Sequence, residues 1–256
     1  MVTCLLKKSY QHKNFKEIDF QDLWGGNGVF TTMWIFDKPS KILFFKQHIK
    51  NLIRSVKAYK LNKPNLEKNI LKLLKINIKK NYRYNHLLRI AVNNKIISIS
   101  LRKRPKLRLK FNLKLVNYKR NRPEFKNLKY QVILKYLSKM NASTSDIGLC
   151  NNRKILESGT SNILFIKNNK IFSPINKIYK GITFKFFENK LRKIIKKDIL
   201  IKSLNEYDEI ILIGSGKGVA SVCTINDIKW RRKSLKFYKL LLNFYKTEVN
   251  KCSIYK

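Results

Sequence analysis

Three kinds of reactive or anion-binding group follow one another between positions 124 and 183 of the chain. Lys126 supplies an amine, which becomes a nucleophile once it has lost its proton. Glu157 supplies a carboxylate within an otherwise neutral stretch. Gly181-Ile182-Thr183 is a glycine-led turn before a predicted helix, where free backbone N–H groups and a hydroxyl can bind an anion. The segment therefore predicts a nucleophile, an acid and an anion-binding turn.

Each of these groups also has an ordinary structural interpretation. Lys126 is one of 45 lysines, and Glu157 is one of 15 acidic residues that could pair with any nearby lysine at the end of a strand. Turns that contain glycine are common. The order of the three groups favours the chemical interpretation, because a buried acid needs a partner and an amine lies upstream of it.

The chain is strongly basic, with a formal net charge of +42 over 256 residues. Such a charge suits an anionic partner such as nucleic acid. However, 45 of the 57 basic residues are lysine and only 12 are arginine, on which specific base recognition depends. The lysines are also spread along every segment. We therefore expect non-specific nucleic-acid binding at most, and keep as an alternative a basic nucleic-acid-binding protein that has lost catalysis.

The composition indicates a folded protein, with 44% hydrophobic and 12% aromatic residues. Its four cysteines and three histidines are scattered without metal-ligand spacing, so we expect no metal site and a reducing compartment. The N-terminal stretch lacks the apolar core of a signal peptide, and no apolar run approaches the roughly 18 residues of a membrane span. These features predict a cytoplasmic protein without a membrane partner.

Hydrophobic periodicity predicts an α/β protein in two parts. A break in the pattern at residues 118–123 separates a smaller N-terminal domain, residues 1–120, from a larger C-terminal domain, residues 121–256, which carries Lys126. The first 25 residues show only weak patterning. The expected strands are residues 29–36, two around Asn93-Asn94, 107–115, a hairpin around Asn168-Asn169, and 209–213. The expected helices are residues 46–59, one opening at Pro64, 126–140, 183–196 and 234–245.

Taken in order, these motifs resemble those of the class IV pyridoxal phosphate enzymes, which include branched-chain and D-amino acid aminotransferases and aminodeoxychorismate lyase. The resemblance covers residues 28–227, and it is strongest in the series 126–128, 157–162, 181–183 and 208–211. It implies a fold-type IV enzyme with two α/β domains and a pyridoxal 5'-phosphate site between them. It also implies a homodimer and a small amino acid-like substrate.

The resemblance implies roles for individual residues. Lys126 matches the lysine that forms the Schiff base with the cofactor and moves the substrate Cα proton. Glu157 matches the acid that keeps the pyridine ring protonated, and Thr32 is a candidate catalytic hydroxyl beside the substrate. The other cofactor-binding residues that it implies are Asn162, Ile182, Thr183, Ser215 and Gly216.

Three positions depart from the family pattern. Asn51 stands where the family has a phosphate-binding arginine, Trp34 where a strand arginine is usual, and Lys129 where an asparagine is usual. Lys50 and Arg54 flank Asn51 but are expected to point elsewhere on the predicted helix, which turns by about 100° per residue. These losses would alter specificity, weaken cofactor binding or mark a degenerating enzyme.

Two reactions remain open. Residues 30–32 and 156–162 resemble aminodeoxychorismate lyase, which releases pyruvate to give 4-aminobenzoate for folate synthesis, more than they resemble branched-chain aminotransferases. We therefore expect the lyase first. A branched-chain or D-amino acid aminotransferase on the same fold is the alternative.

Overall fold

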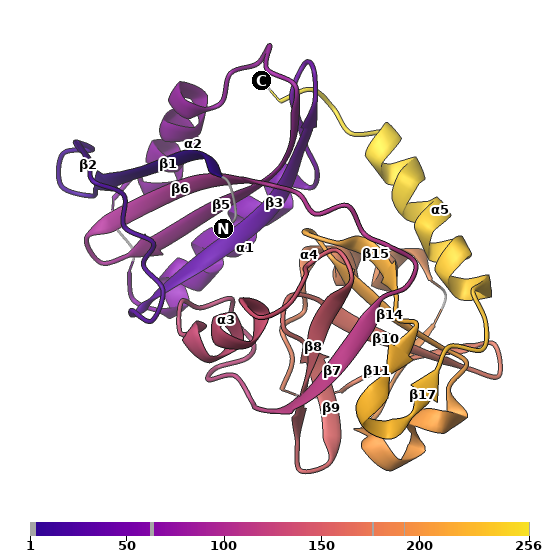
Figure 1. Cartoon of the computed structure of the whole chain (residues 1–256). Coiled ribbons are helices and arrows are strands. Elements are labelled where there is room, and N and C mark those ends of the chain that lie inside the picture. The colour runs from indigo at the N-terminus through magenta and orange to yellow at the C-terminus, as the bar shows by residue number, and fades with distance from the viewer. Residues whose placement is uncertain (1–3, 62–63, 176, 192, 256) are drawn as a thin grey trace. The chain divides into compact units, whose positions relative to one another are not determined.

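The structure, a computed structural model, describes residues 4–61, 64–175, 177–191 and 193–255 (Figure 1). Residues 1–3 of the N-terminal stretch lie outside these ranges. The chain divides into two compact α/β units. The first comprises Met1–Arg104, Phe125–Gln131 and Lys251–Lys256, and the second comprises Pro105–Glu124 and Val132–Asn250. Lys126 therefore lies in the first unit, whereas the sequence pattern assigned it to the C-terminal domain.

A six-stranded antiparallel sheet is the framework of the first unit, with the strand order β2-β1-β6-β5-β3-β4. Its strands are β1 (Cys4–Gln11), β2 (Glu17–Ile18), β3 (Gly28–Asp37), β4 (Lys41–Ile42), β5 (Tyr84–Asn93) and β6 (Ile96–Lys103). Every residue of β3 faces a partner on β5, from Gly28 opposite Asn93 to Asp37 opposite Tyr84. Because side chains alternate along a strand, this register assigns every second residue to the same face.

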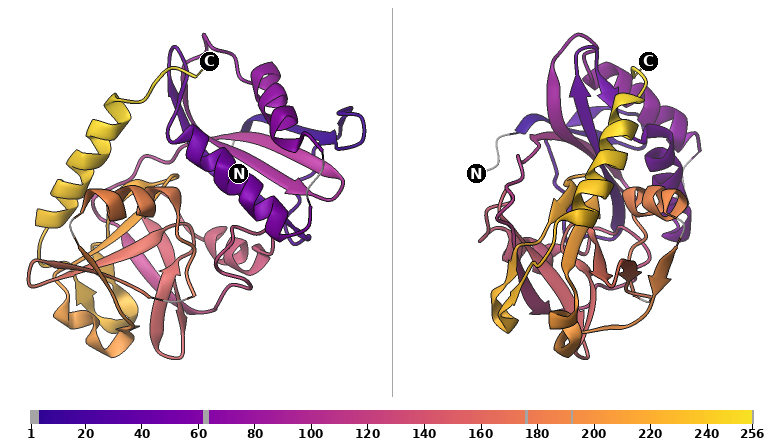
Figure 2. Two further views of the ribbon diagram at one scale, coloured as in Figure 1. Left: turned by 180° about the vertical axis from the view of Figure 1, so that it is seen from behind. Right: turned by 90° about the vertical axis from the view of Figure 1, so that its right-hand side faces the viewer.

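Two helices cover one face of this sheet, α1 (Phe45–Ala58) and α2 (Leu66–Asn77), as Figure 2 shows. Both carry apolar residues at helical spacing, which pack against inward side chains of β3, β5 and β6. The shared core includes Ile49, Leu52, Val56, Ile70, Leu74, Val29, Met33, Ile35, Leu88, Ile90 and Ile99. The opposite face carries the remaining residues of β3, among them Phe30 and Thr32.

Two sheets share one core in the second unit, with the orders β12-β11-β10-β14-β15 and β13-β9-β8-β7-β16-β17. The strands are β7 (Asn112–Asn117), β8 (Ser145–Asn151), β9 (Lys154–Ser158), β10 (Asn162–Lys167), β11 (Lys170–Ser173), β12 (Ile194–Lys196), β13 (Ile199–Leu200), β14 (Glu209–Gly214), β15 (Gly218–Ser221), β16 (Thr224–Ile225) and β17 (Trp230–Arg231). The α-helices are α3 (Gln131–Leu137), α4 (Ile182–Lys190) and α5 (Lys236–Asn250). Short 3-10 helices span Ile201–Glu206 and Asn226–Ile228.

Apolar side chains of both sheets meet in this core, Phe111 and Leu113 from one side and Phe165 and Leu212 from the other. Helix α5 contacts β14 and β15, and α4 also contacts β14. The short turns between β9 and β10 and between β14 and β15 therefore join strands whose side chains are buried in this core.

Three sequence-based expectations are wrong in part. The strand expected over residues 107–115 begins only at Asn112, because the Arg108 N–H donates to Ser143 O instead of to a neighbouring strand. The helix expected over residues 183–196 ends at Lys190 and is followed by strand β12. The weakly patterned first 25 residues contain β1, which pairs along β6.

The helix expected over residues 126–140 is also wrong at its start, since α3 begins at Gln131. Residues 126–128 are instead hydrogen-bonded to β3 at its edge. This difference matters for Lys126, because the lysine is held by a sheet and not by a helix.

Among the described residues, no helix is long and apolar enough to cross a lipid bilayer. No group of three metal-ligating side chains occurs within those residues either.

Candidate active site

Lys126 lies at the edge of the first unit's sheet. The Phe30 N–H donates to Lys126 O at 2.9 Å, and the Leu128 N–H donates to Gly28 O at 2.9 Å. Asn127 forms an isolated bridge with Val29. These backbone bonds continue the sheet beside β3 and fix the backbone from which the amine projects.

An aromatic cluster borders the Lys126 side chain. Lys126 Nζ lies 5.1 Å from the centroid of the Phe30 ring. The Phe30 ring contacts Trp24 at a centroid distance of 4.8 Å and Tyr130 at 5.6 Å, and Trp24 stacks on Tyr130 at 5.7 Å. Aromatic ring faces attract a cation yet exclude water, so the amine has a partly apolar surrounding.

His48, on α1, is buried and lies near enough to Lys126 to feel its charge. Its Nδ1 shares a hydrogen bond of 2.8 Å with Thr31 Oγ1. Burial, followed by the positive charge of Lys126, lowers the pKa of His48 to about 3. His48 is therefore neutral at physiological pH, and the neighbourhood of Lys126 gains no second positive charge from it.

This lowered pKa predicts a loss of stability in acid. Between pH 6.5 and pH 3 the unfolded chain binds a proton at His48 that the folded chain does not, so the free energy of unfolding falls as the pH falls. At about pH 4.5 the loss from this residue should be about 3 kcal/mol. Urea unfolding of His48→Asn, which cannot titrate, should show a smaller acid-induced loss than the wild type. Equal losses in the two proteins would contradict the assignment.

Glu157 is buried in the second unit, at the end of β9. Its Oε1 accepts a hydrogen bond of 2.6 Å from Arg120 Nε within an ion pair, and its Oε2 accepts from the Tyr179 N–H at 3.2 Å. The Arg120 side chain is 4% exposed and that of Glu157 is 6% exposed. The interpretation of Glu157 as a surface carboxylate is therefore wrong.

The side chain of Asn162 connects this acid to the glycine-led turn. Asn162 Nδ2 donates to Tyr179 O at 2.5 Å, and the Gly181 N–H donates to Asn162 Oδ1 at 3.1 Å. A Cβ at position 181 would lie 2.9 Å from Asn162 Oδ1, so glycine is needed for this close approach. Helix α4 begins directly after Gly181, and its first N–H groups have no acceptor within the helix.

A second turn that contains glycine, between β14 and β15, lies beside the start of α4. Thr183 Oγ1 lies 3.5 Å from Ser215 Oγ, which brings hydroxyls from the two turns together. Gly216 follows Ser215 in the turn. The second unit thus gathers six of the predicted cofactor-binding residues: Glu157, Asn162, Ile182, Thr183, Ser215 and Gly216. Lys126 and Thr32 belong to the first unit.

A comparison with protein families decides how these residues are classified. The model of the family described as amino-transferase class IV matches residues 28–225, which include both the lysine and the acid. The chain belongs to the class IV aminotransferase family. As a class IV enzyme it depends on pyridoxal phosphate.

Solved structures of this family share the fold. The branched-chain aminotransferase of Thermoproteus uzoniensis, solved with norvaline, is 15% identical, and the match covers 97% of this chain and 99% of that one at a TM-score of 0.74. The Escherichia coli enzyme is 15% identical over 93% of each chain, at 0.72. The Thermobaculum terrenum enzyme in its pyridoxal phosphate form is 15% identical over 94% and 93%, at 0.73. These matches confirm the fold-type IV architecture. No curated protein sequence matches the chain significantly.

The second unit of this class IV enzyme fits the anionic end of pyridoxal phosphate. The N–H groups of Ile182 and Thr183 at the start of α4 are suited to a phosphate, and the hydroxyls of Thr183 and Ser215 can add hydrogen bonds. The buried carboxylate of Glu157 fits a protonated ring nitrogen. The same unit therefore offers partners for both charged ends of the cofactor.

Arg120 is a site residue that the sequence patterns do not indicate, since it lies in the break at residues 118–123. It donates to Glu157 and, through Nη2, to Pro123 O at 2.7 Å. Its residue type was the available signal. The chain has only 12 arginines, and arginine is the residue preferred in buried ion pairs.

At position 51, where the family has a phosphate-binding arginine, the side chain of Arg54 lies closer than the sequence pattern predicts. Asn51 is buried on α1, and its Oδ1 accepts a hydrogen bond of 2.8 Å from Arg54 Nη2. Residues three apart are neighbours on a helix surface, so the expectation that Arg54 points elsewhere is wrong. A guanidinium therefore accompanies Asn51, although it comes from the next turn of the helix.

Proposed function

We propose that the chain is an active aminotransferase that moves an amino group from an amino acid to a 2-oxo acid. The buried Glu157–Arg120 pair carries this proposal, because it maintains a carboxylate in a protected place beside two anion-binding turns. When bound, pyridoxal phosphate draws electrons away from the substrate Cα. A carboxylate partner for its ring nitrogen strengthens that effect.

In this proposal each residue has a defined role. Lys126 holds the cofactor covalently through Nζ and takes and returns the proton at the substrate Cα. Glu157 keeps the ring nitrogen protonated, and Arg120 keeps Glu157 ionised and in place. The residues that bind the phosphate are Ile182, Thr183, Ser215 and Gly216, with Asn162 holding the first turn against Tyr179.

Two arginines on the face of the first unit's sheet opposite α1 and α2 support a substrate with a carboxylate. Thr32 on β3 faces Arg89 on β5, and Arg102 on β6 faces Leu87, the residue two positions before Arg89. Arg89 pairs with Asp22 and lies 4.4 Å from the Trp24 ring centroid. We propose that these guanidinium groups replace the arginine that Trp34 displaces. Thr32 shares their face and is the hydroxyl that would lie beside the substrate.

Aminodeoxychorismate lyase remains the second candidate. The motif of residues 30–32 favours it, and Phe30 and Thr32 both lie on the face of the sheet opposite α1 and α2. The solved structures named above are branched-chain aminotransferases, and this reverses the order expected from the motif. We place transamination first for that reason.

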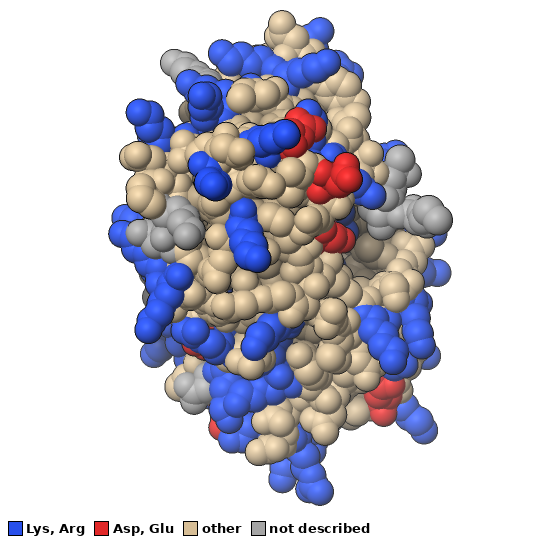
Figure 3. Space-filling view, turned by 90° about the vertical axis from the view of Figure 1, so that its left-hand side faces the viewer, with Lys and Arg blue, Asp and Glu red and all other residues tan. Residues whose placement is uncertain are grey.

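The proposed assembly is a homodimer without a specific nucleic-acid partner. Lysine and arginine side chains are scattered over the visible face in Figure 3 and do not gather into one stripe. A diffuse charge of this kind supports weak, salt-sensitive association and not sequence recognition.

A pair of assays on the purified protein with pyridoxal phosphate tests this function. Leucine and other amino acids, each given with 2-oxoglutarate, should yield glutamate. Aminodeoxychorismate, given alone, should yield no 4-aminobenzoate. Release of 4-aminobenzoate without glutamate formation would establish the lyase and overturn the proposal.

A further inference from the structure

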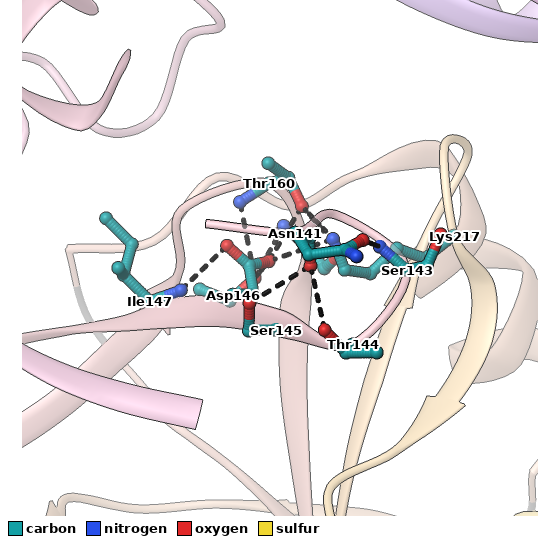
Figure 4. A network of polar contacts seen from close by, with 10 residues as sticks. Asn141, Ser143, Thr144, Ser145, Asp146, Ile147, Thr160 and Lys217 are labelled. Carbon is teal, nitrogen blue, oxygen red and sulfur yellow. Dashed lines mark hydrogen bonds and ion pairs between the residues drawn. The ribbon is translucent and has the colours of Figure 1, made fainter. Parts of the chain in front are cut away.

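A second buried ion pair lies in the second unit and has no role in the chemistry above (Figure 4). Lys217 Nζ lies 3.2 Å from Asp146 Oδ2 and donates a hydrogen bond of 2.8 Å to Thr160 Oγ1. The Lys217 side chain is 7% exposed and that of Asp146 is 0% exposed. Lysine and aspartate are almost never buried to this degree unless they are paired. Each of these two side chains is therefore the charged partner that allows the other to be buried.

Asp146 holds the turn that follows Glu157 through hydrogen bonds. Its Oδ2 accepts hydrogen bonds from Ser158 Oγ at 3.0 Å and from Thr160 Oγ1 at 2.8 Å. Ser158 Oγ in turn accepts from the Ser161 N–H at 2.8 Å. Residues 158–161, between Glu157 (the acid proposed to contact the cofactor ring, below called the ring acid) and Asn162, therefore form a compact loop hydrogen-bonded to the buried Asp146 carboxylate.

Lys217 joins the second phosphate turn to that loop. It follows Ser215 and Gly216 in the turn between β14 and β15, and its ammonium group reaches across to Thr160 and Asp146. The Phe111 ring lies beneath, with its centroid 5.6 Å from Lys217 Nζ. The ammonium group thus bridges two turns that contact different ends of the proposed cofactor.

A close backbone approach at Gly214 accompanies this link. A Cβ at Gly214 would lie 3.0 Å from Ser161 Oγ. The start of the β14–β15 turn therefore passes directly against the loop that Asp146 holds. The two turns are in contact both through the buried ion pair and through this glycine.

We infer that Lys217 and Asp146 are positioning residues that fix the phosphate-binding turn relative to the ring acid. The inference rests on the proposed pyridoxal phosphate function. Donors held in place before a ligand arrives bind it more tightly, because little ordering remains to be done. Release of the turn should therefore weaken the contacts to the phosphate more than the contacts to the ring.

The affinity ratio between pyridoxal 5'-phosphate and unphosphorylated pyridoxal measures this effect. Equilibrium titration of apoenzyme, followed by absorbance, gives both dissociation constants. For Lys217→Met the preference for the phosphorylated form should fall about 10-fold or more. Lys167→Met is the matched control, since Lys167 forms an exposed ion pair with Glu206 at 2.5 Å, and its preference should equal that of the wild type.

Lys217→Met leaves the Asp146 carboxylate buried without its cation. The uncompensated negative charge would repel phosphate and would also destabilise the fold. The double variant Lys217→Met with Asp146→Asn removes both charges, so a loss of preference that persists in it reports the position of the turn. A wild-type preference in the double variant would overturn the inference. A wild-type protein that binds both compounds equally would also overturn it, because the two turns would then not bind the phosphate, whereas the proposed function is tested separately by glutamate formation.

Discussion

Replacing Lys126 by alanine is expected to abolish the covalent attachment of pyridoxal phosphate and to lower turnover at least about 10³-fold. The lysine performs two tasks in the proposed mechanism, holding the cofactor and moving the Cα proton, and alanine can do neither. Absorbance in the visible range reports the attachment. Glutamate formation under saturating substrate reports the turnover.

Lys129→Ala is the control for this variant. Lys129 lies three residues further on, is exposed, and carries the same charge. Its removal should leave both the visible absorbance and the turnover near wild-type levels. If Lys126→Ala kept its visible band while Lys129→Ala lost it, the nucleophile would be assigned to the wrong residue.

Glu157→Gln is expected to lower turnover by about 10²- to 10³-fold while the cofactor remains attached to Lys126. A neutral amide cannot hold a positive charge on the ring nitrogen, so the ring withdraws electrons less effectively from the substrate Cα. The substitution also leaves the buried Arg120 guanidinium without its anion, which costs about 3–5 kcal/mol of folding free energy. Turnover and urea unfolding therefore need to be measured on the same preparations.

Glu209→Gln separates these two effects. Glu209 is another buried acid in the same unit, where it accepts hydrogen bonds of 2.8 Å from the Phe237 and Tyr238 N–H groups at the start of α5. Its replacement should lower stability but leave the turnover of folded enzyme unchanged. Equal losses of turnover in the two glutamine variants would show that Glu157 acts only through folding.

The residues that the structure brings together in the second unit have local signals in the sequence. A glycine before a helix, a hydroxyl at the helix start and a scarce acid are each visible in a few consecutive residues. Asn162 and Gly181 are far apart in sequence and meet only in the fold, yet each belongs to a short motif that is visible by itself. Local chemistry of this kind requires no knowledge of the fold.

The errors arise where partners are distant in sequence. Residues 126–130 fit a helical pattern, but the edge of β3 offers them backbone hydrogen bonds, and this pairing outweighs the local preference. Arg120 and Glu157 are 37 residues apart, and Asp146 and Lys217 are 71 apart by their numbers. Spacing alone cannot reveal such pairs, because a buried ion pair is specified by the fold that brings its members together.

The most direct test of the account is to find which lysine carries the cofactor. Borohydride reduction of the holoenzyme fixes a lysine-bound pyridoxyl group, and peptide mass spectrometry then locates it among the 45 lysines. We expect the group on Lys126. Its recovery on another lysine, or its absence from every peptide, would contradict the assignment of Lys126 as the lysine that holds the cofactor.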